Sequence, residues 1–194
     1  CSIGTDMIDL KVAAELGVVV SNQPGRTAPV VAEHMFGMMF TVAKRAAFHT
    51  SEVRAGRWTR RMNLTVQGKV LGIIGFGKIG REVAKRAAAF GMRVLALSRS
   101  LTDDEAKSAG AERSDLEAIF RDSDFISLHA PLTAETEHLL GPDQFTKMKP
   151  TAFVINTARG GIIDWQETER RAAELLARVG LKESPKSIVA DLGL

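Results

Sequence analysis

The chain has 194 residues, of which 45% are hydrophobic, and this is enough for one good core and the edge of a second domain. Its 26 basic and 23 acidic residues leave a net charge of +3. No helix-turn-helix, finger or aromatic-basic pattern accompanies the densest basic patch, so we expect no nucleic-acid partner. The single cysteine, with no signal peptide and no membrane-length apolar run in the sequence, leads us to expect a cytoplasmic protein.

The first 23 residues have the pattern of the tail of an α/β unit. Residues 6–16 have helical apolar spacing, and the run Gly17-Val-Val-Val20 predicts a strand. The chain begins with Cys1 rather than methionine and opens inside such a unit, so we expect a piece of a longer protein. Residues 1–23 are interpreted as the remnant of a separate domain.

A long helix is predicted from about Thr27, with Pro29 in its first turn, where a missing N–H does no harm. Apolar residues occur on nearly every side of this predicted helix. It therefore either contacts a second domain or a partner subunit, or forms the central core helix of this domain alone. His34 in this helix has no second residue at metal-ligand spacing, so we predict a core histidine and no metal.

The segment that follows this helix is charged. Residues 49–68 predict an exposed helix and a connector, with Trp58 as the one large apolar anchor. We interpret residues 24–66 as a helical connector between the N-terminal remnant and the next domain.

A glycine-rich turn organises the rest of the chain. Residues 70–74 predict a buried strand that runs into Gly75, Gly77 and Gly80, the spacing of a dinucleotide-binding turn. In this pattern the first glycine permits a tight turn, the second lets the backbone approach a pyrophosphate, and the third allows close helix–strand packing. A helix over residues 78–90 would direct free N–H groups at the phosphates, before a strand at residues 93–97.

A phosphate loop of the nucleotide-triphosphatase type is an alternative that overlaps the same residues. Gly72 to Lys78 fits its glycine-to-lysine spacing. That motif needs a Ser or Thr next, whose hydroxyl binds magnesium, and Ile79 stands there instead. The sequence therefore favours the dinucleotide turn.

The remaining chain alternates helices and strands. Helices are predicted over residues 101–109 and 142–147. A capping box from Ser114 to Glu117 predicts the start of another short helix, and a further helix is predicted from a cap at Asp164 to about residue 179, where Gly180 ends it. Strands are predicted at residues 124–128, 152–155 and 186–190. Such alternation requires a parallel sheet covered on both faces, so we predict an α/β fold with a Rossmann-type doubly wound parallel sheet over residues 67–194.

The end of the second strand of this sheet bears on the choice of dinucleotide. A carboxylate there would bind the ribose 2′-hydroxyl and repel a 2′-phosphate, but the strand ends in Ser98 and Arg99, with no carboxylate before Asp103. An arginine offers a planar fork for charge-assisted bonds to phosphate. The sequence therefore favours NADP(H) over NAD(H).

Several motifs in order together resemble the D-isomer-specific 2-hydroxyacid dehydrogenases. They are Gly4-Thr-Asp-Met-Ile-Asp9, Val31-Ala-Glu-His34, Gly75-Phe-Gly-Lys-Ile-Gly80, His129-Ala-Pro-Leu-Thr133 and Ile155-Asn-Thr-Ala-Arg-Gly-Gly161. The resemblance implies that the nicotinamide domain is inserted into a flavodoxin-like substrate domain, of which residues 1–23 are the remnant. It also implies that the long helix after the Pro-Gly turn helps to build a homodimer.

The resemblance assigns cofactor contacts by position. They fall on Phe76, Gly77, Lys78 and Ile79 for the pyrophosphate, on Ser98 for the adenosine end, on His129, Ala130, Pro131 and Thr136 for the adenosine and ribose wall, and on Asn156, Thr157 and Ala158 around the nicotinamide. His129 resembles a packing and hydrogen-bonding residue rather than the catalytic acid.

Arg159 matches the catalytic arginine of the family. A 2-oxo acid presents a carbonyl and a carboxylate that one guanidinium can grip, which orients the carbonyl and stabilises the charge that develops on its oxygen. The backbone N–H groups of Ile3 and Gly4 resemble the loop that receives the substrate carboxylate.

The sequence departs from the family after Asp164. The family completes its site with a Glu and a His in a downstream Pro-His motif, whereas Glu183 and Asp191 stand in no matching frame. We therefore expect an oxidoreductase of D-2-hydroxy and 2-oxo acids that is truncated at both ends, and weakly active or inactive as given. The alternative is a non-catalytic module that senses the dinucleotide. Glyoxylate, hydroxypyruvate and larger 2-oxo acids stay open as substrates.

Overall fold

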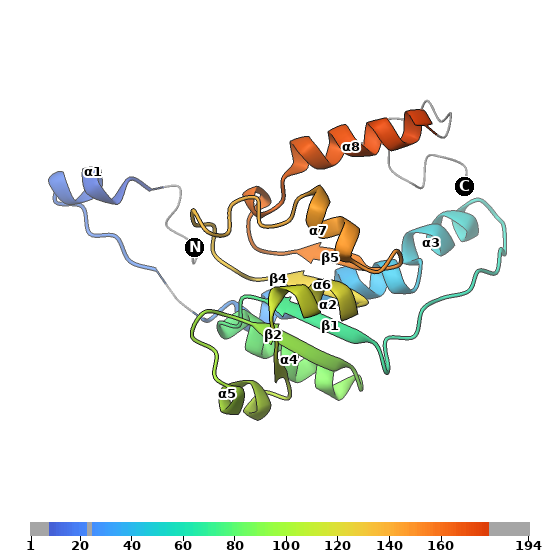
Figure 1. Ribbon diagram of the computed structural model, residues 1–194, viewed down its shortest axis with the longest axis horizontal. Coiled ribbons are helices and arrows are strands. Elements are labelled where there is room, and N and C mark those ends of the chain that lie inside the picture. The colour runs from blue at the N-terminus through green and yellow to red at the C-terminus, as the bar shows by residue number, and fades with distance from the viewer. Residues whose placement is uncertain (1–7, 23–24, 179–194) are drawn as a thin grey trace.

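Five parallel strands form the centre of the computed structural model, which describes residues 8–22 and 25–178 (Figure 1). The spatial order is β3-β2-β1-β4-β5, so the chain leaves β1 first toward one edge and then toward the other. The sheet confirms the predicted Rossmann-type fold, and its order reverses between β1 and β4. The strands are β1 (Val70–Ile74), β2 (Arg93–Leu97), β3 (Glu112–Arg113), β4 (Phe125–Leu128) and β5 (Phe153–Asn156).

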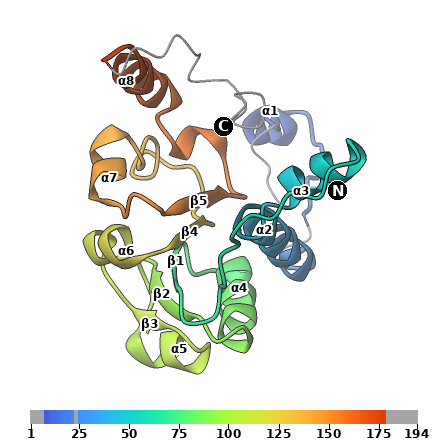
Figure 2. The ribbon, with the colours of Figure 1, turned by 90° about the vertical axis from the view of Figure 1, so that its right-hand side faces the viewer.

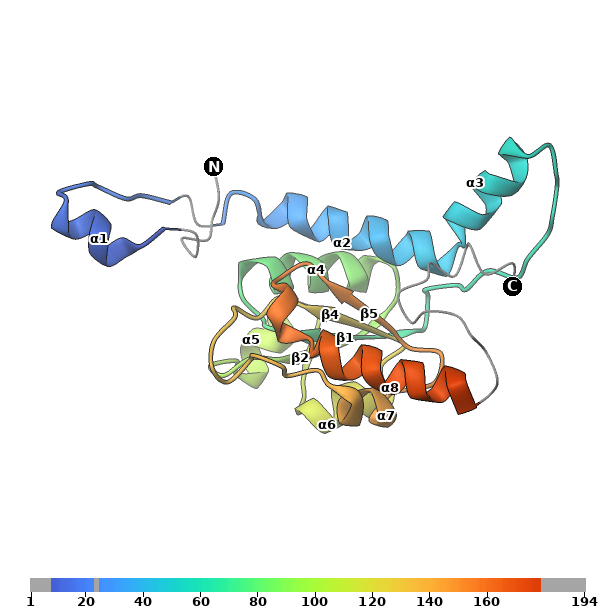
Figure 3. The same ribbon diagram turned by 90° about the horizontal axis from the view of Figure 1, so that it is seen from above.

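Helices cover both faces of this sheet, as Figures 2 and 3 show. On one face lie α2 (Ala28–Ala43) and α4 (Lys78–Ala89), and on the other α6 (Leu116–Asp122) and α7 (Pro142–Lys147). The core follows the two-residue period of the strands. In β1, Leu71 and Ile73 join the cluster under α2 and α4, whereas Ile74 joins the cluster under α6. The remaining helices are α1 (Leu10–Glu15), α3 (Ala46–Arg54), α5 (Asp103–Ser108) and α8 (Trp165–Arg178).

The helix α2 serves the core with only one of its sides. Met35 and Met39 are fully buried against the domain, while Val30 is 63% exposed and Val42 is 40% exposed. The all-round apolar pattern thus divides into a side that packs on this domain and a side that remains open. The prediction of a core histidine was wrong: His34 is exposed, because the helix turns residue 34 away from the buried side that Met35 and Met39 occupy. After α2 the chain turns at Arg45, which has a φ of 49°, and α3 leaves the body of the domain (Figure 3).

The N-terminal part and the connector differ from two predictions. Residues 17–20 form no strand, because no strand lies beside them in the described part of the chain, and Val19 is 92% exposed. Trp58 is 81% exposed and anchors nothing in the described chain. The connector is held instead by polar contacts: Glu52 binds Arg57, and the Nζ of Lys44 donates to the carbonyl of Leu64 at 2.7 Å.

Smaller differences concern helix starts and one strand. The cap of α6 is Asp115 rather than Ser114, since its Oδ1 accepts from the amide of Ala118 at 2.7 Å. The predicted helix over residues 101–109 is the shorter α5, capped by Thr102. The short strand β3 consists of two exposed charged residues and has no apolar pattern to predict it. The predicted strand at 186–190 and the predicted stop at Gly180 lie outside the described residues.

Candidate functional site

Three loops meet at the carboxyl edge of the central strands. The amide of Gly75, just after β1, donates to the carbonyl of Leu97 at the end of β2, at 2.8 Å. The amide of His129, just after β4, donates to the carbonyl of Ile74 at 2.7 Å. Ligands of doubly wound sheets bind at this edge, where the strand order reverses. The structure therefore brings the glycine turn and the loops after β2 and β4 together.

The three glycines of the turn have different surroundings. A Cβ on Gly75, whose φ is 97°, would lie 2.4 Å from the amide nitrogen of Ala130, and one on Gly80 would lie 2.4 Å from the carbonyl oxygen of Gly75. These two positions must be glycine for the protein to pack. A Cβ on Gly77 would meet no described atom within 4 Å. Open space at Gly77, directly before α4, is what a pyrophosphate needs in order to approach the helix N-terminus.

The side chains of the turn point away from this open space. Phe76 is 3% exposed and lies under the guanidinium of Arg81, 5.3 Å from the ring centroid, while Ile79 packs against the core. The Phe76 side chain is therefore buried, so Phe76 offers a ligand its backbone, whereas Ile79 is only partly buried. The Lys78 side chain lies over Gly25, because a Cβ there would be 2.6 Å from the Lys78 Cδ. The loop before α2 thus reaches the glycine turn.

His129 ties the ends of β4 and β5 together. Its Nε2 lies 2.9 Å from the Oγ of Ser127, and its Nδ1 lies 3.1 Å from the Oγ1 of Thr157. Burial lowers the pKa of His129 to about 4, because the charged imidazolium is disfavoured away from water. The ring is therefore neutral near pH 7, with both nitrogens engaged, as expected of a packing residue rather than an acid.

The loop after β4 is shaped by its own hydroxyl groups. The Oγ1 of Thr136 donates to the carbonyl of Pro131 at 2.5 Å and accepts from the amide of Thr133 at 2.8 Å. The Thr136 hydroxyl is therefore engaged within the loop that the sequence analysis assigned to the adenosine wall. Ala130 is buried, whereas Pro131 is exposed.

Glu135 on this loop escaped the sequence analysis. Its carboxylate accepts from the Oγ1 of Thr133 at 2.6 Å, and this bond is the main cause of a lowered pKa, to which the positive charge of Arg99 also contributes. Arg99 is exposed just beyond β2, and Ser98 is half-buried, with its carbonyl accepting from the amide of Leu101. No sequence motif pairs residues 99 and 135, since only the sheet order brings their loops together.

The loop after β5 presents Arg159. The Oδ1 of Asn156 accepts from the amide of Ala158 at 2.9 Å, and its Nδ2 donates to the carbonyl of Arg159 at 2.9 Å. The side chain of Asn156 thus shapes the turn that Arg159 ends. The guanidinium of Arg159 is exposed, and one of its nitrogens donates to the carbonyl of Ala158 at 3.2 Å.

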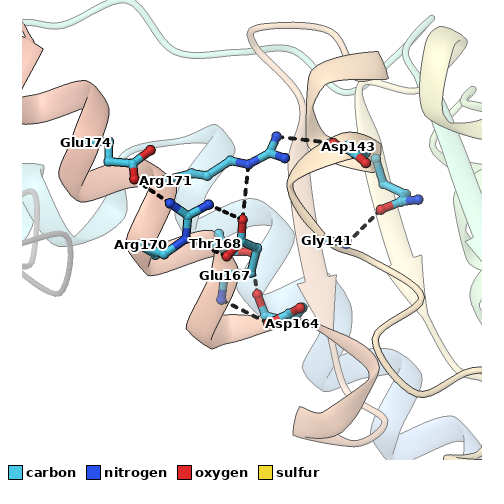
Figure 4. A network of polar contacts seen from close by, with 9 residues as sticks. Gly141, Asp143, Asp164, Glu167, Thr168, Arg170, Arg171 and Glu174 are labelled. Atoms are coloured by element: carbon cyan, nitrogen blue, oxygen red, sulfur yellow. Dashed lines mark hydrogen bonds and ion pairs between the residues drawn. The ribbon is translucent and has the colours of Figure 1, made fainter.

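A second set of contacts holds this loop from behind. The amide of His138 donates to the carbonyl of Gly161 at 2.9 Å, and the amide of Leu140 donates to the carbonyl of Ile162 at 3.0 Å. Figure 4 shows α8 joined to α7 by Arg171, whose guanidinium lies 3.2 Å from Asp143. The two backbone contacts were not predicted, because they join segments that carry no motif, and the ion pair was not predicted, because it joins two helices that are far apart in the sequence.

The match to known proteins decides the family. Residues 36–171 match the family described as D-isomer specific 2-hydroxyacid dehydrogenase, NAD binding domain. The chain belongs to this family. The D-2-hydroxyacid dehydrogenase domain seen here has the glycine turn, the loop after β4 and the loop after β5 at one edge of its sheet, and its cofactor class is a nicotinamide dinucleotide.

Relatives of this dehydrogenase domain include several named reductases. The hydroxypyruvate reductase of Thermotoga maritima is 44% identical over 164 residues, covering 84% of this chain and 53% of its own. The glyoxylate reductase of Thermococcus litoralis is 39% identical over 172 residues, covering 84% and 52%. The chain spans about half the length of these curated relatives. A D-lactate dehydrogenase from Aquifex aeolicus, solved with NAD and lactic acid, matches with a TM-score of 0.79 at 29% identity, covering 98% of this chain and 62% of that one.

The rest of the described dehydrogenase domain adds two negative findings. Residues 8–22 and 25–178 contain no group of three or more His, Cys, Asp or Glu side chains that could hold a metal ion. None of the helices in the same ranges is both long and apolar enough to cross a membrane. Ile3 and Gly4, predicted to receive the substrate carboxylate, lie outside the described residues.

Proposed function

We propose that this chain is the cofactor domain of an oxidoreductase that moves a hydride between NADP(H) and a D-2-hydroxy acid/2-oxo acid pair. The observation that carries the proposal is the open space at Gly77, at the start of α4, in a chain matched to the NAD-binding domain of this family. A Cβ at this position would meet no atom of the described residues within 4 Å, so the described chain leaves room there for a ligand. The alternative is a module of the same superfamily that senses the dinucleotide without turnover.

In this proposal the chain holds the cofactor mainly with its backbone. The amides from Phe76 to Ile79 bind the pyrophosphate, favoured by the positive end of the α4 dipole. Ser98 and Arg99 hold the adenosine end, and the loop from His129 to Thr136 forms its wall. Asn156, Thr157 and Ala158 line the nicotinamide. The preference for NADP(H) rests on the exposed guanidinium of Arg99, which can pair with a 2′-phosphate.

Arg159 orients the substrate in this proposal. Its guanidinium binds the carboxylate and the carbonyl oxygen of a 2-oxo acid in two parallel hydrogen bonds and stabilises the negative charge that develops on that oxygen. The bound dinucleotide supplies the hydride. Ile3 and Gly4 would add backbone N–H bonds to the carboxylate. Asn156 holds the turn so that the Arg159 side chain starts from a fixed backbone.

The proton for the carbonyl oxygen needs a separate donor. His129 is neutral and has both ring nitrogens engaged by hydroxyl groups, so it does not supply this proton. Losing a general acid costs a factor of about 100 to 10,000 in rate. We therefore propose that the 194-residue chain binds its cofactor and still reduces its substrate, but slowly, without the Glu and His of the family.

Binding and turnover are measured separately to test this proposal. Fluorescence titration with NADPH and NADH should show binding of both, with NADPH tighter, whereas tighter NADH would refute the role of Arg99. Hydroxypyruvate and glyoxylate, the substrates named for two relatives, are then added and NADPH absorbance is followed. Slow oxidation that Arg159→Gln abolishes supports the reductase. Binding with no oxidation in either protein favours the sensing module.

We propose further that the chain forms a homodimer through α2 and the connector. The open side of α2 carries Val30, 63% exposed, and the connector carries Trp58 and Met62, 81% and 91% exposed. A second copy would remove this apolar surface from water. Sedimentation equilibrium should give twice the chain mass of 21.0 kDa, and Val30→Asp should shift it toward the single mass. A wild-type chain that stays monomeric at high concentration contradicts this proposal.

A further inference from the structure

The loops after β2 and β4 flank the glycine turn from opposite sides. β1 lies between β2 and β4 in the sheet. The turn after β1 binds the end of β2 through the amide of Gly75 and packs against Ala130 in the loop after β4. Arg99 follows β2, and Glu135 belongs to the loop after β4. The two charged residues therefore lie on the two loops that flank the glycine turn at the same edge of the sheet.

Glu135 is held in place rather than merely exposed. The turn from Thr133 to Thr136 is closed by the Thr136 hydroxyl, which binds both the carbonyl of Pro131 and the amide of Thr133. Within this turn the Oε2 of Glu135 accepts from the Thr133 hydroxyl at 2.6 Å. That bond and the positive charge of Arg99 both lower the pKa of Glu135, so its carboxylate is ionised and within electrostatic reach of the guanidinium.

We propose that Glu135 is a specificity-determining residue that opposes the 2′-phosphate at Arg99 and so weakens the binding of NADP(H) relative to NAD(H). This inference rests on the proposed function. A 2′-phosphate carries close to two negative charges, whereas the 2′-hydroxyl of NADH carries none. The carboxylate both repels the phosphate and screens the guanidinium that would bind it. Arg99 supplies the attraction for NADP(H), and Glu135 sets how much of that attraction remains.

A charge-neutral substitution isolates the effect. Glu135→Gln keeps an oxygen that can accept from the Thr133 hydroxyl, so the loop keeps its shape while it loses the charge. At water-like screening over several ångströms, removing one charge opposite a phosphate should tighten NADPH binding about three- to tenfold, with NADH changed by less than about twofold. The gain should shrink in high salt, because exposed charges are screened beyond about 3 Å at 1 M.

The matched control is Glu137→Gln. Glu137 lies on the same loop, is exposed, and carries the same charge, so its loss changes the net charge of the loop equally. Dissociation constants of NADPH and NADH are measured by fluorescence for the 194-residue chain, both single variants, Arg99→Gln and the Arg99→Gln/Glu135→Gln double variant. The NADPH gain of Glu135→Gln should disappear in the Arg99→Gln background, and Glu137→Gln should give a much smaller gain.

The outcomes separate this inference from the proposed function. Equal changes for NADPH and NADH in Glu135→Gln overturn it, as does an equal gain in Glu137→Gln or a gain that survives the loss of Arg99. In those cases dinucleotide binding itself stands. If the unmodified chain binds neither dinucleotide, the proposed function fails and the role of Glu135 fails with it. Titration with 2′-AMP and 5′-AMP as probes checks that the gain follows the 2′-phosphate.

Discussion

Gly75 and Ala130 approach each other too closely for a side chain to stand between them. A Cβ on Gly75 would lie 2.4 Å from the Ala130 amide nitrogen and 2.8 Å from its Cα. Since backbone atoms cannot yield as a flexible side chain can, the glycine is needed for the loop after β1 to pass the loop after β4. The first glycine of the turn thus serves the assembly of the edge as well as the turn itself.

Gly75→Ala should destabilise the fold. The residue has a φ of 97°, which costs an L side chain energy, and the methyl group would displace the loop at Ala130. Strain and overpacking together should lower the free energy of unfolding by about 2 to 5 kcal/mol. Urea denaturation followed by circular dichroism measures the loss. A variant as stable as the parent would contradict the close approach of the two loops.

Gly77→Ala is the matched substitution that should spare the fold and weaken binding. Its φ of −79° suits an L residue, and the added Cβ would meet no described atom within 4 Å. We expect the free energy of unfolding to change by less than about 1 kcal/mol, because two effects nearly cancel. Alanine reduces the backbone entropy of the unfolded chain, which stabilises the fold, but it is a poorer N-cap residue than glycine for α4, which destabilises it. The dinucleotide should bind at least about tenfold more weakly, a loss of about 1.4 kcal/mol, because the methyl group occupies the pyrophosphate position. Unchanged NADPH affinity would show that the pyrophosphate lies elsewhere.

Stability should depend on the protonation of His129. Burial holds its native pKa at about 4, below the ordinary value of 6.5, so the unfolded chain takes up a proton first as the pH falls. The contribution of the neutral His129 ring to the free energy of unfolding is fully present above about pH 6.5 and is lost between that pH and about pH 4. Between pH 7 and pH 5 we expect the free energy of unfolding to fall by about 2 kcal/mol from this residue.

Two measurements assign this pH dependence to His129. Proton NMR of the imidazole should give a titration midpoint near pH 4, as its native pKa requires. Urea denaturation at pH 7 and pH 5 should show a smaller difference for His129→Gln than for the parent, since the variant has no imidazole to protonate at this position. Equal differences in the two proteins would mean that the ring is not the source.

The fold was predictable where local pattern and tertiary structure agree. The helix α4 was predicted at residues 78–90 because its apolar residues recur on one side and Gly91 follows, and the structure has it at Lys78–Ala89. The strand predicted at residues 17–20 was wrong, because an apolar β-branched run forms a strand only when another strand pairs with it. β3 was missed for the opposite reason: Glu112 and Arg113 have no strand pattern, and pairing with β2 alone makes them a strand.

The site shows the same division. The glycine spacing and Arg159 stand in contiguous motifs, so the sequence could predict that they lie on loops after strands. Glu135 and Arg99 lie on loops at either side of the glycine turn because β1 lies between β2 and β4, and no local sequence pattern encodes that strand order. The amides of His138 and Leu140 support the Arg159 loop, and this could not be predicted from the sequence either, because almost any residue type supplies such N–H groups.

Ser123→Ala should leave the protein as stable or make it more stable, although Ser123 is completely buried. Its Oγ has no hydrogen-bond partner among the described residues, and it lies beside β1, 2.5 Å from where a Cβ on Gly72 would stand. An unpaired buried hydroxyl costs about 1 to 3 kcal/mol, and the amide of Ser123 keeps its bond to Ile119 without the side chain. We therefore expect the free energy of unfolding in urea to stay equal or to rise by about 1 kcal/mol, less than the full cost because a small cavity remains. A clear fall would show that the hydroxyl has a partner, such as a bound water.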